Sequence, residues 1–143
     1  MTTDCLTIKQ TPKSWNWRGH NITYQQTGET GAAVVLVHGF GASWGHWRKN
    51  LPVLGETCCC YAIDLIGFGG SDKPQPNTEI AYTFETWGQQ LADFCREVVG
   101  SPAFLIGNSF GCIANRMNIS YTCTYQIELL PNPCRVGVNN LTN

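Results

Sequence analysis

Charged residues are scarce in this sequence: they make up 13% of its 143 residues, and the formal net charge is −1. A chain so close to neutral has no electrostatic field that would attract nucleic acid or an anionic membrane surface. The sequence also lacks an apolar run of about 18 residues, so no transmembrane helix is expected. Residues 1–5 show neither the basic nor the apolar segment of a secretory signal or transit peptide. We therefore expect a cytoplasmic protein, or a plastid one if the source is eukaryotic.

Metal-ligand patterns are missing as well, although the sequence contains eight cysteines. Three of them are consecutive, at residues 58–60, and no C-x-x-C pair or histidine lies nearby to complete a tetrahedral site. No metal and no cofactor is therefore expected. Without a secretory signal, the thiols are predicted to be reduced and to serve as small core residues rather than to form a disulfide framework.

Three short apolar runs, at residues 32–37, 58–63 and 103–106, predict buried strands. Residues 6–26, which precede them, are interpreted as two antiparallel strands joined by a turn. Strands that alternate with helices are typical of parallel βαβ units, so the expected fold class is α/β. The carboxyl ends of such strands lie at one edge of the sheet, where the loops that follow them build a site.

Two helices are predicted between these runs. Ser43 is expected to cap the first, which covers residues 44–54 with a bend or break at Pro52. Thr83 is expected to cap the second, in which apolar residues recur at steps of three and four on one face. Gly100 is expected to end that helix.

Residues 107–111 fit the pattern G-x-S-x-G and directly follow the third apolar run. This pattern is typical of a nucleophile elbow, a tight turn from strand to helix that exposes a serine hydroxyl above the sheet. The residues that flank Ser109 must be small for the turn to close, and Gly107 and Gly111 meet that need. Ser109 is therefore the candidate nucleophile.

Three other segments accompany this motif in a fixed order: residues 38–41 after the first apolar run, residues 64–71 after the second, and residues 73–74 beyond them. Together these segments resemble the serine-nucleophile branch of the α/β-hydrolase fold, and within it the pheophytinase-like hydrolases of cyanobacteria and plastids. The resemblance covers about residues 5–114. It implies the N-terminal part of an α/β-hydrolase sheet, incomplete, in which antiparallel strands precede parallel βαβ units.

The resemblance also implies roles for individual residues. Ser109 would be the nucleophile, and the backbone N–H groups of Phe40 and Phe110 would form an oxyanion hole for the charge that develops during acyl transfer. His38 and Gly39 would contact the substrate. The implied activity is hydrolysis of a small-molecule ester or a similar acyl compound. An aspartate in place of the serine would instead have indicated a dehalogenase or an epoxide hydrolase.

The chain departs from the family in the rest of the catalytic triad. The family's acid and base follow the nucleophile in the order Ser, Asp or Glu, His. All three histidines of this sequence precede Ser109, no aspartate follows it, and the later carboxylate, Glu128, has no strand pattern around it. Asp64 is expected to form hydrogen bonds at the end of its strand rather than to act as the triad acid, and His38 to have a structural or site-lining role rather than to act as the base. We therefore expect an inactive chain that lacks the triad acid and histidine.

Residues 1–114 are expected to form the N-terminal half of the hydrolase domain, and residues 115–143 a poorly structured, non-family tail in which no helix or strand period lasts. The change in composition resembles a truncated or frameshifted gene. The alternative is a non-catalytic fragment or partner-binding remnant, since the second half of the domain is missing. Without a strand from that half, residues 103–106 would form an apolar edge with unpaired backbone groups. A third possibility is a second chain that supplies the missing aspartate and histidine.

Overall fold

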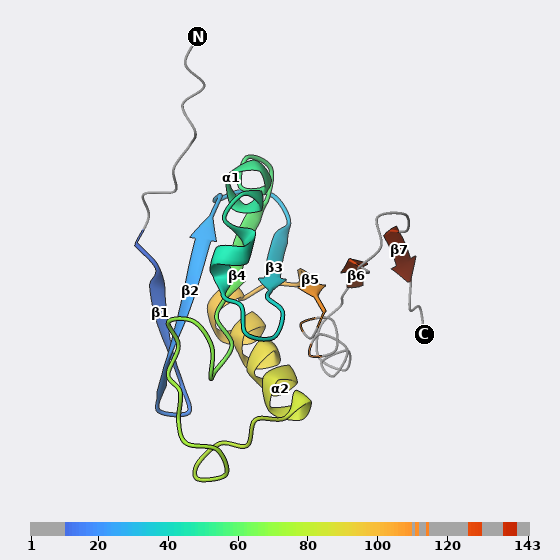
Figure 1. The fold of residues 1–143 in the computed structure, drawn as a ribbon. Coiled ribbons are helices and arrows are strands. Elements are labelled where there is room, and N and C mark those ends of the chain that lie inside the picture. Colours follow the sequence, from blue (N-terminus) through green and yellow to red (C-terminus); the bar gives the residue numbers. More distant parts are fainter. Residues whose placement is uncertain (1–10, 110, 112–113, 115–125, 130–135, 140–143) are drawn as a thin grey trace.

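The computed structural model describes residues 11–109, 111, 114, 126–129 and 136–139. Within this part of the chain, seven strands form a single sheet in the order β1-β2-β4-β3-β5-β6-β7 (Figure 1). The strands are β1 (Lys13–Trp17), β2 (His20–Thr27), β3 (Ala33–Val37), β4 (Cys59–Ile63), β5 (Ala103–Asn108), β6 (Gln126–Leu129) and β7 (Val136–Asn139).

The pairing directions match the expected α/β class. Strand β1 pairs with β2, and β2 with β4, in antiparallel register. Strands β4, β3, β5 and β6 are parallel neighbours, and β7 is antiparallel to β6. Every residue of β3 is buried, because the strand lies inside the sheet and is covered on both faces. The predicted antiparallel start and the parallel units that follow are therefore confirmed.

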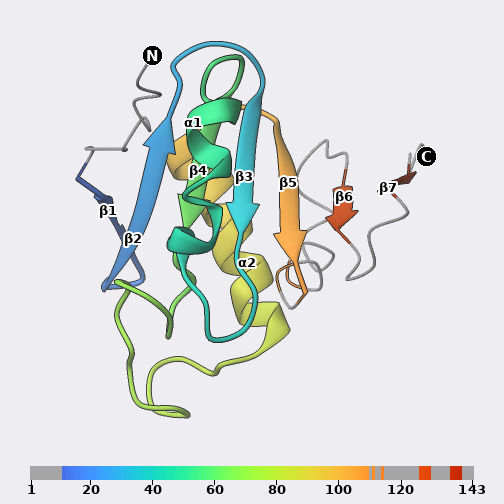
Figure 2. The ribbon, with the colours of Figure 1, turned by 45° about the horizontal axis from the view of Figure 1, so that its top comes forward.

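Helices cover both faces of the sheet. The 3₁₀ helix η1 (Trp44–Trp47) and α1 (Asn50–Leu54) connect β3 to β4, whereas α2 (Phe84–Phe94) and the π-helix η2 (Cys95–Val99) connect β4 to β5. The chain crosses the sheet in opposite directions in these two connections, so right-handed crossovers place them on opposite faces. Figures 1 and 2 show α1 and α2 on either side of the sheet, and the core is accordingly divided into two clusters.

The prediction of one continuous helix over residues 44–54 is wrong. The segment divides into η1 and α1, and the division falls at residues 48–49 rather than at Pro52. Pro52 lies in the first turn of α1, where its missing N–H would have had no partner within the helix, so it does not interrupt the structure. The predicted cap is confirmed, because the Ser43 hydroxyl accepts a hydrogen bond from the Gly45 N–H at 3.3 Å.

The second predicted helix is confirmed at both ends. The Thr83 hydroxyl accepts a hydrogen bond from the Thr86 N–H at 3.2 Å. Gly100 ends the helical segment in the left-handed conformation, with φ of 72°. Its apolar residues bury against the β1–β2 hairpin and the adjoining strands, where the ring of Phe94 packs edge-on against Trp15, Tyr24 and Tyr61.

The expectation that residues 103–106 form an unpaired edge is wrong. Strand β6 pairs with β5 from Leu105↔Gln126 to Asn108↔Leu129. Ladder hydrogen bonds join backbone groups, so a short strand such as β6 needs no alternating side-chain pattern to form them. Strands β6 and β7 both lie within residues 115–143, the predicted tail. The other residues of that tail lie outside the described part of the chain, so the predicted domain boundary stays a prediction.

The indole N–H groups of Trp15 and Trp17 hydrogen-bond the β1–β2 hairpin to the helical segment formed by α2 and η2. The Trp17 Nε1–H donates to Asp93 Oδ2 at 2.8 Å inside the core, and the other carboxylate oxygen accepts from Gln89 and Arg96. Burial by itself raises the pKa of Asp93, but these hydrogen bonds outweigh it and lower the pKa from its usual 3.8. The matching bond from Trp15 to Glu97 is exposed to solvent.

We expect Trp17→Phe to lower the free energy of unfolding by about 2 kcal/mol, because it removes a buried donor from a charged acceptor. Trp15→Phe is the matched control, and its exposed bond should contribute less than about 1 kcal/mol. Urea unfolding followed by circular dichroism measures both values. Equal losses of unfolding free energy in the two variants would contradict the claim that the buried bond stabilises the fold more than the exposed one.

We also expect stability to fall in acid through Asp93. Its pKa is lower in the folded chain than in the unfolded chain, so its contribution is present above the unfolded value of 3.8 and is lost as pH falls through the folded value. Urea unfolding at a series of pH values below about 5 should show a flatter decline for Asp93→Asn than for the unmodified chain. Glu29→Gln, at an exposed turn, should leave the decline unchanged. Parallel curves for the unmodified chain and Asp93→Asn would rule Asp93 out as the source.

Candidate functional site

The turn predicted at Ser109 is observed. Strand β5 ends at Asn108, Ser109 follows with φ of 53°, and Gly111 and Ala114 are helical. A positive φ is uncommon for a residue with a Cβ atom, and it reverses the chain sharply between strand and helix. Ser109 is exposed, so its hydroxyl is accessible at the end of the sheet.

Gly111 permits the close crossing that follows this turn. A Cβ atom placed on Gly111 would lie 2.6 Å from the carbonyl oxygen of Val37 and 2.8 Å from that of His38. Both oxygens belong to the backbone and cannot move aside cheaply. A glycine is therefore required here so that the helix after Ser109 can pass the end of β3.

The parallel register of β3 and β5 brings the two predicted loops together. Val37 is paired with Gly107, so the residues just beyond the two strands are also neighbours. A Cβ atom on Gly39 would lie 3.6 Å from the Cβ of Ser109. After β3 the chain leaves toward η1 on one face, whereas Ala114, after β5, packs in the core on the opposite face. Figure 2 shows the two strands ending at the same edge of the sheet, which is where the connections after them diverge to opposite faces.

The His38 ring is held in place by hydrogen bonds to backbone groups of the loops after β3 and β4. Its side chain is fully buried, Nε2 accepts a hydrogen bond from the Leu65 N–H at 3.0 Å, and Nδ1–H therefore donates to the Gly39 carbonyl at 2.7 Å. Burial lowers the pKa of His38 despite the opposing effects of that carbonyl and of Asp64, so the ring is neutral at pH 7. These contacts support a structural role for His38. Its contact with substrate, like that of Gly39, stays a prediction.

Asp64 joins the loops after β3 and β4. Its Oδ1 accepts a hydrogen bond from the Trp44 N–H at 2.5 Å, and its Oδ2 accepts one from the Gly70 N–H at 2.8 Å. The residue is 1% exposed. A Cβ atom on Gly69 would lie 2.3 Å from Oδ2, so the loop can wrap around this carboxylate only with a glycine there. The hydrogen-bonding role predicted for Asp64 is confirmed.

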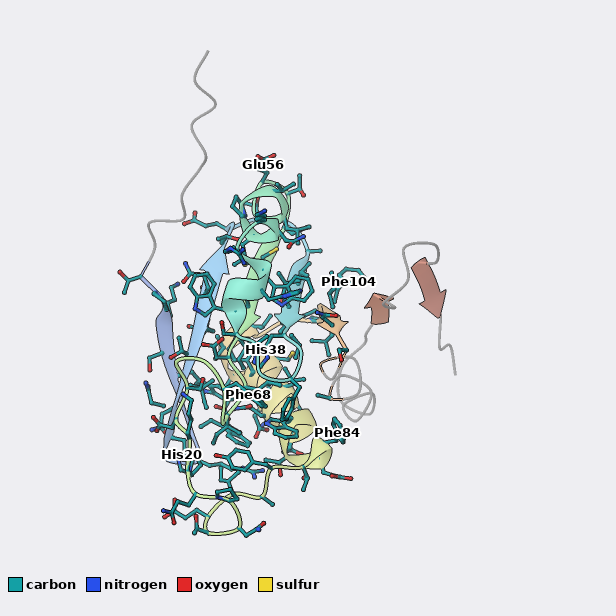
Figure 3. All side chains as sticks on the ribbon, viewed as in Figure 1. His20, His38, Glu56, Phe68, Phe84 and Phe104 are labelled. Carbon is teal, nitrogen blue, oxygen red and sulfur yellow. The ribbon has the colours of Figure 1, made fainter. Side chains whose placement is uncertain are left out.

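Aromatic rings pack around His38 and Phe40, in the loop that follows β3. Phe68 packs edge-on against His38 and against Phe40, with ring centroids 5.3 and 5.5 Å apart; Figure 3 shows His38 and Phe68 together at this end of the sheet. Phe40, whose backbone N–H is the first predicted oxyanion donor, is 76% exposed. The second predicted donor, Phe110, lies outside the described residues. The loop of one predicted donor is thus placed beside Ser109.

Sequence reasoning missed two features of this edge. His46 Nε2 lies 3.1 Å from the side-chain nitrogen of Asn108, the residue before Ser109. Glu128 lies in β6, paired with Gly107, so the expectation of no strand around it is wrong. Pairs so far apart in sequence leave no local pattern.

Among the described residues, no imidazole hydrogen-bonds to the Ser109 hydroxyl.

The described residues contain no group of three or more His, Cys, Asp or Glu side chains that could hold a metal ion. Within the same residues, no helix has the length and apolar character needed to cross a bilayer. The thiols of Cys58, Cys59, Cys60 and Cys95 are free.

Several characterised proteins are similar in sequence to this chain, at comparable levels of identity. A haloalkane dehalogenase from Bradyrhizobium diazoefficiens is 37% identical over 94 residues, which cover 65% of this chain and 29% of the relative. A 2-hydroxy-6-oxo-6-(2'-aminophenyl)hexa-2,4-dienoic acid hydrolase from Metapseudomonas resinovorans is 34% identical over 100 residues, 67% of this chain and 33% of the relative. The chloroplastic pheophytinase of Arabidopsis thaliana is more distant, at 27% over 106 residues, 55% of this chain and 22% of the relative.

Solved structures agree on the fold. An epoxide hydrolase from Vigna radiata superposes with a TM-score of 0.74 over 86% of this chain and 42% of its own, and its 20% identity supports the fold alone. The chain spans about a third of the length of the first two curated relatives. The sequence pattern of the alpha/beta hydrolase family matches residues 34–138, on both sides of the predicted boundary at residue 114. The chain therefore belongs to the alpha/beta hydrolase family.

Proposed function

We propose that Ser109 is the nucleophile of a site for the hydrolysis of small-molecule esters or similar acyl compounds. The observation that carries the proposal is the geometry of the turn: an exposed serine with a left-handed backbone at the end of β5, directly beside the loop of Gly39. The relatives include a dehalogenase, but a serine rather than an aspartate occupies the turn here. A serine hydroxyl favours acyl transfer through a covalent intermediate.

The proposed reaction uses three groups of this chain. The Ser109 oxygen would attack the carbonyl carbon, and the backbone N–H groups of Phe40 and Phe110 would stabilise the negative charge that develops on the carbonyl oxygen. A single donor of this kind typically contributes about 3 kcal/mol to catalysis. His38 would act indirectly, because its hydrogen bonds to Leu65 and Gly39 hold the loop that presents Phe40.

We further propose that these 143 residues by themselves turn substrate over slowly. A serine hydroxyl is a poor nucleophile at neutral pH unless a base accepts its proton. His38 has both ring nitrogens bonded to backbone groups, and no histidine follows Ser109 in the sequence. A site without its base still retains about 10³- to 10⁴-fold catalysis over water from the oxyanion hole and substrate binding.

The narrower assignment to the pheophytinase-like hydrolases is also a proposal. Its support is the order of the segments at residues 38–41, 64–71 and 107–111, together with the distant match to the plant pheophytinase. Relatives with other activities match at higher identity. The substrate of this chain is therefore proposed only at the level of an ester or acyl compound.

We expect slow release of nitrophenol from short-chain p-nitrophenyl esters by the purified chain, and a rise in that rate when imidazole is added as an external base. Ser109→Ala should remove the protein-dependent rate and its rise, and it also corrects for hydrolysis by imidazole alone. Ser101→Ala, an exposed serine just before β5, is the matched control and should behave like the unmodified chain.

Two results would contradict these proposals separately. Equal rates for the unmodified chain and Ser109→Ala, with and without imidazole, would reject Ser109 as the nucleophile. Turnover of about 1 s⁻¹ or more without imidazole, abolished by Ser109→Ala, would reject the absence of a base.

A further inference from the structure

The side chain before the candidate nucleophile links segments that are distant in sequence. Asn108 Nδ2 lies 3.1 Å from His46 Nε2, across 62 residues of sequence. The same nitrogen would be 3.8 Å from a Cβ atom on Gly39, whose neighbour Phe40 carries a proposed oxyanion donor. The Asn108 amide therefore lies where β5, the loop after β3 and helix η1 meet.

His46 is an exposed residue of η1, and this short helix is anchored at its start. The Ser43 hydroxyl caps the helix, and the Trp44 N–H is fixed by the buried carboxylate of Asp64. The His46 ring packs edge-on against Trp47 at 5.0 Å, and Trp47 is 4% exposed. The imidazole thus reaches Asn108 from an element that is itself anchored.

The direction of this hydrogen bond follows from its two atoms. An amide nitrogen can only donate, so His46 Nε2 accepts and the ring proton lies on Nδ1. In that tautomer the acceptor nitrogen of the ring is turned toward Asn108. The contact therefore requires one tautomer of His46, which can be detected spectroscopically.

Ser109 needs such support. A residue with a side chain keeps a left-handed backbone only where its surroundings impose that conformation. Hydrogen bonding to β6 and the crossing of Gly111 hold the backbone on either side of Ser109. The described residues give the Asn108 side chain one further tether, which is His46.

We propose that His46 is a positioning residue: through Asn108 it fixes the turn at Ser109 against the loop of residues 39–42, so that hydroxyl and oxyanion donor face the same point. This inference deepens the proposed function and rests on it. His46 does not touch the Ser109 hydroxyl and takes no part in proton transfer.

The first readout is covalent capture of Ser109 by a fluorophosphonate, followed by intact mass in imidazole buffer. The Ser109 oxygen–phosphorus bond forms, the phosphorus–fluorine bond breaks, fluoride leaves with the electron pair, and the hydroxyl proton passes to imidazole. Capture should be about fivefold slower in His46→Leu and Asn108→Ala, the change expected on losing one hydrogen bond. The double variant should be no slower than either, because both remove the same contact.

His46→Gln tests rescue, since a glutamine oxygen can accept from Asn108, and its capture rate should stay within about twofold of the unmodified rate. Lys49→Ala, on the exposed turn after η1, is the matched control. Unmodified capture rates in both His46→Leu and Asn108→Ala would overturn the inference. So would equal losses in His46→Leu and His46→Gln.

The second readout separates this inference from the proposed function. Long-range ¹H–¹⁵N spectra of His46 should show the Nδ1–H tautomer in the unmodified chain and in Ser109→Ala, and should lose it in Asn108→Ala. Amide exchange of residues 39–42 should be faster in His46→Leu. If Ser109 is never captured, the proposed function fails, and these spectra still decide whether His46 holds the loop. An unchanged tautomer in Asn108→Ala would overturn the inference.

Discussion

The parallel register between β3 and β5 is the constraint on which the candidate site depends. It sets Val37 beside Gly107, and so brings the ends of two strands that are distant in sequence to the same level. Gly39 then lies against Ser109, and the helix after the turn crosses the Val37 carbonyl at a distance that only a glycine allows. A slip of this register would separate the loop from the serine even if both motifs were intact.

Two buried polar side chains at the carboxyl end of the sheet hold its loops by hydrogen bonds and have a structural role. His38 and Asp64 are residue types that often act in catalysis, yet both use their polar atoms to hold backbone N–H and carbonyl groups of neighbouring loops. Satisfying these groups inside the core avoids the cost of burying them unpaired. Ser109 is different, because it is exposed and its backbone is left-handed. At this edge, burial and hydrogen bonding therefore distinguish the structural residues His38 and Asp64 from the candidate nucleophile Ser109.

Much of the fold was predictable because its signals are local. The apolar run of β3 reflects burial on both faces, and Ser43 and Thr83 cap helices through bonds that span two or three residues. The break between η1 and α1 and the pairing of β6 with β5 were not predictable in the same way. Both depend on backbone hydrogen bonds, which almost any side chain permits.

For the site, the turn was predictable from residues 107–111 alone, since G-x-S-x-G specifies a left-handed serine between small neighbours, and the order of residues shows that all three histidines precede Ser109. The groups that surround this serine could be identified only from the folded chain. In the fold, His38 Nε2 is bonded to the Leu65 N–H, Gly39 lies beside Ser109, and His46 is bonded to Asn108. The physical reason is that a turn is fixed by the steric limits of adjacent residues, whereas these contacts arise from strand register and helix packing across the whole sheet.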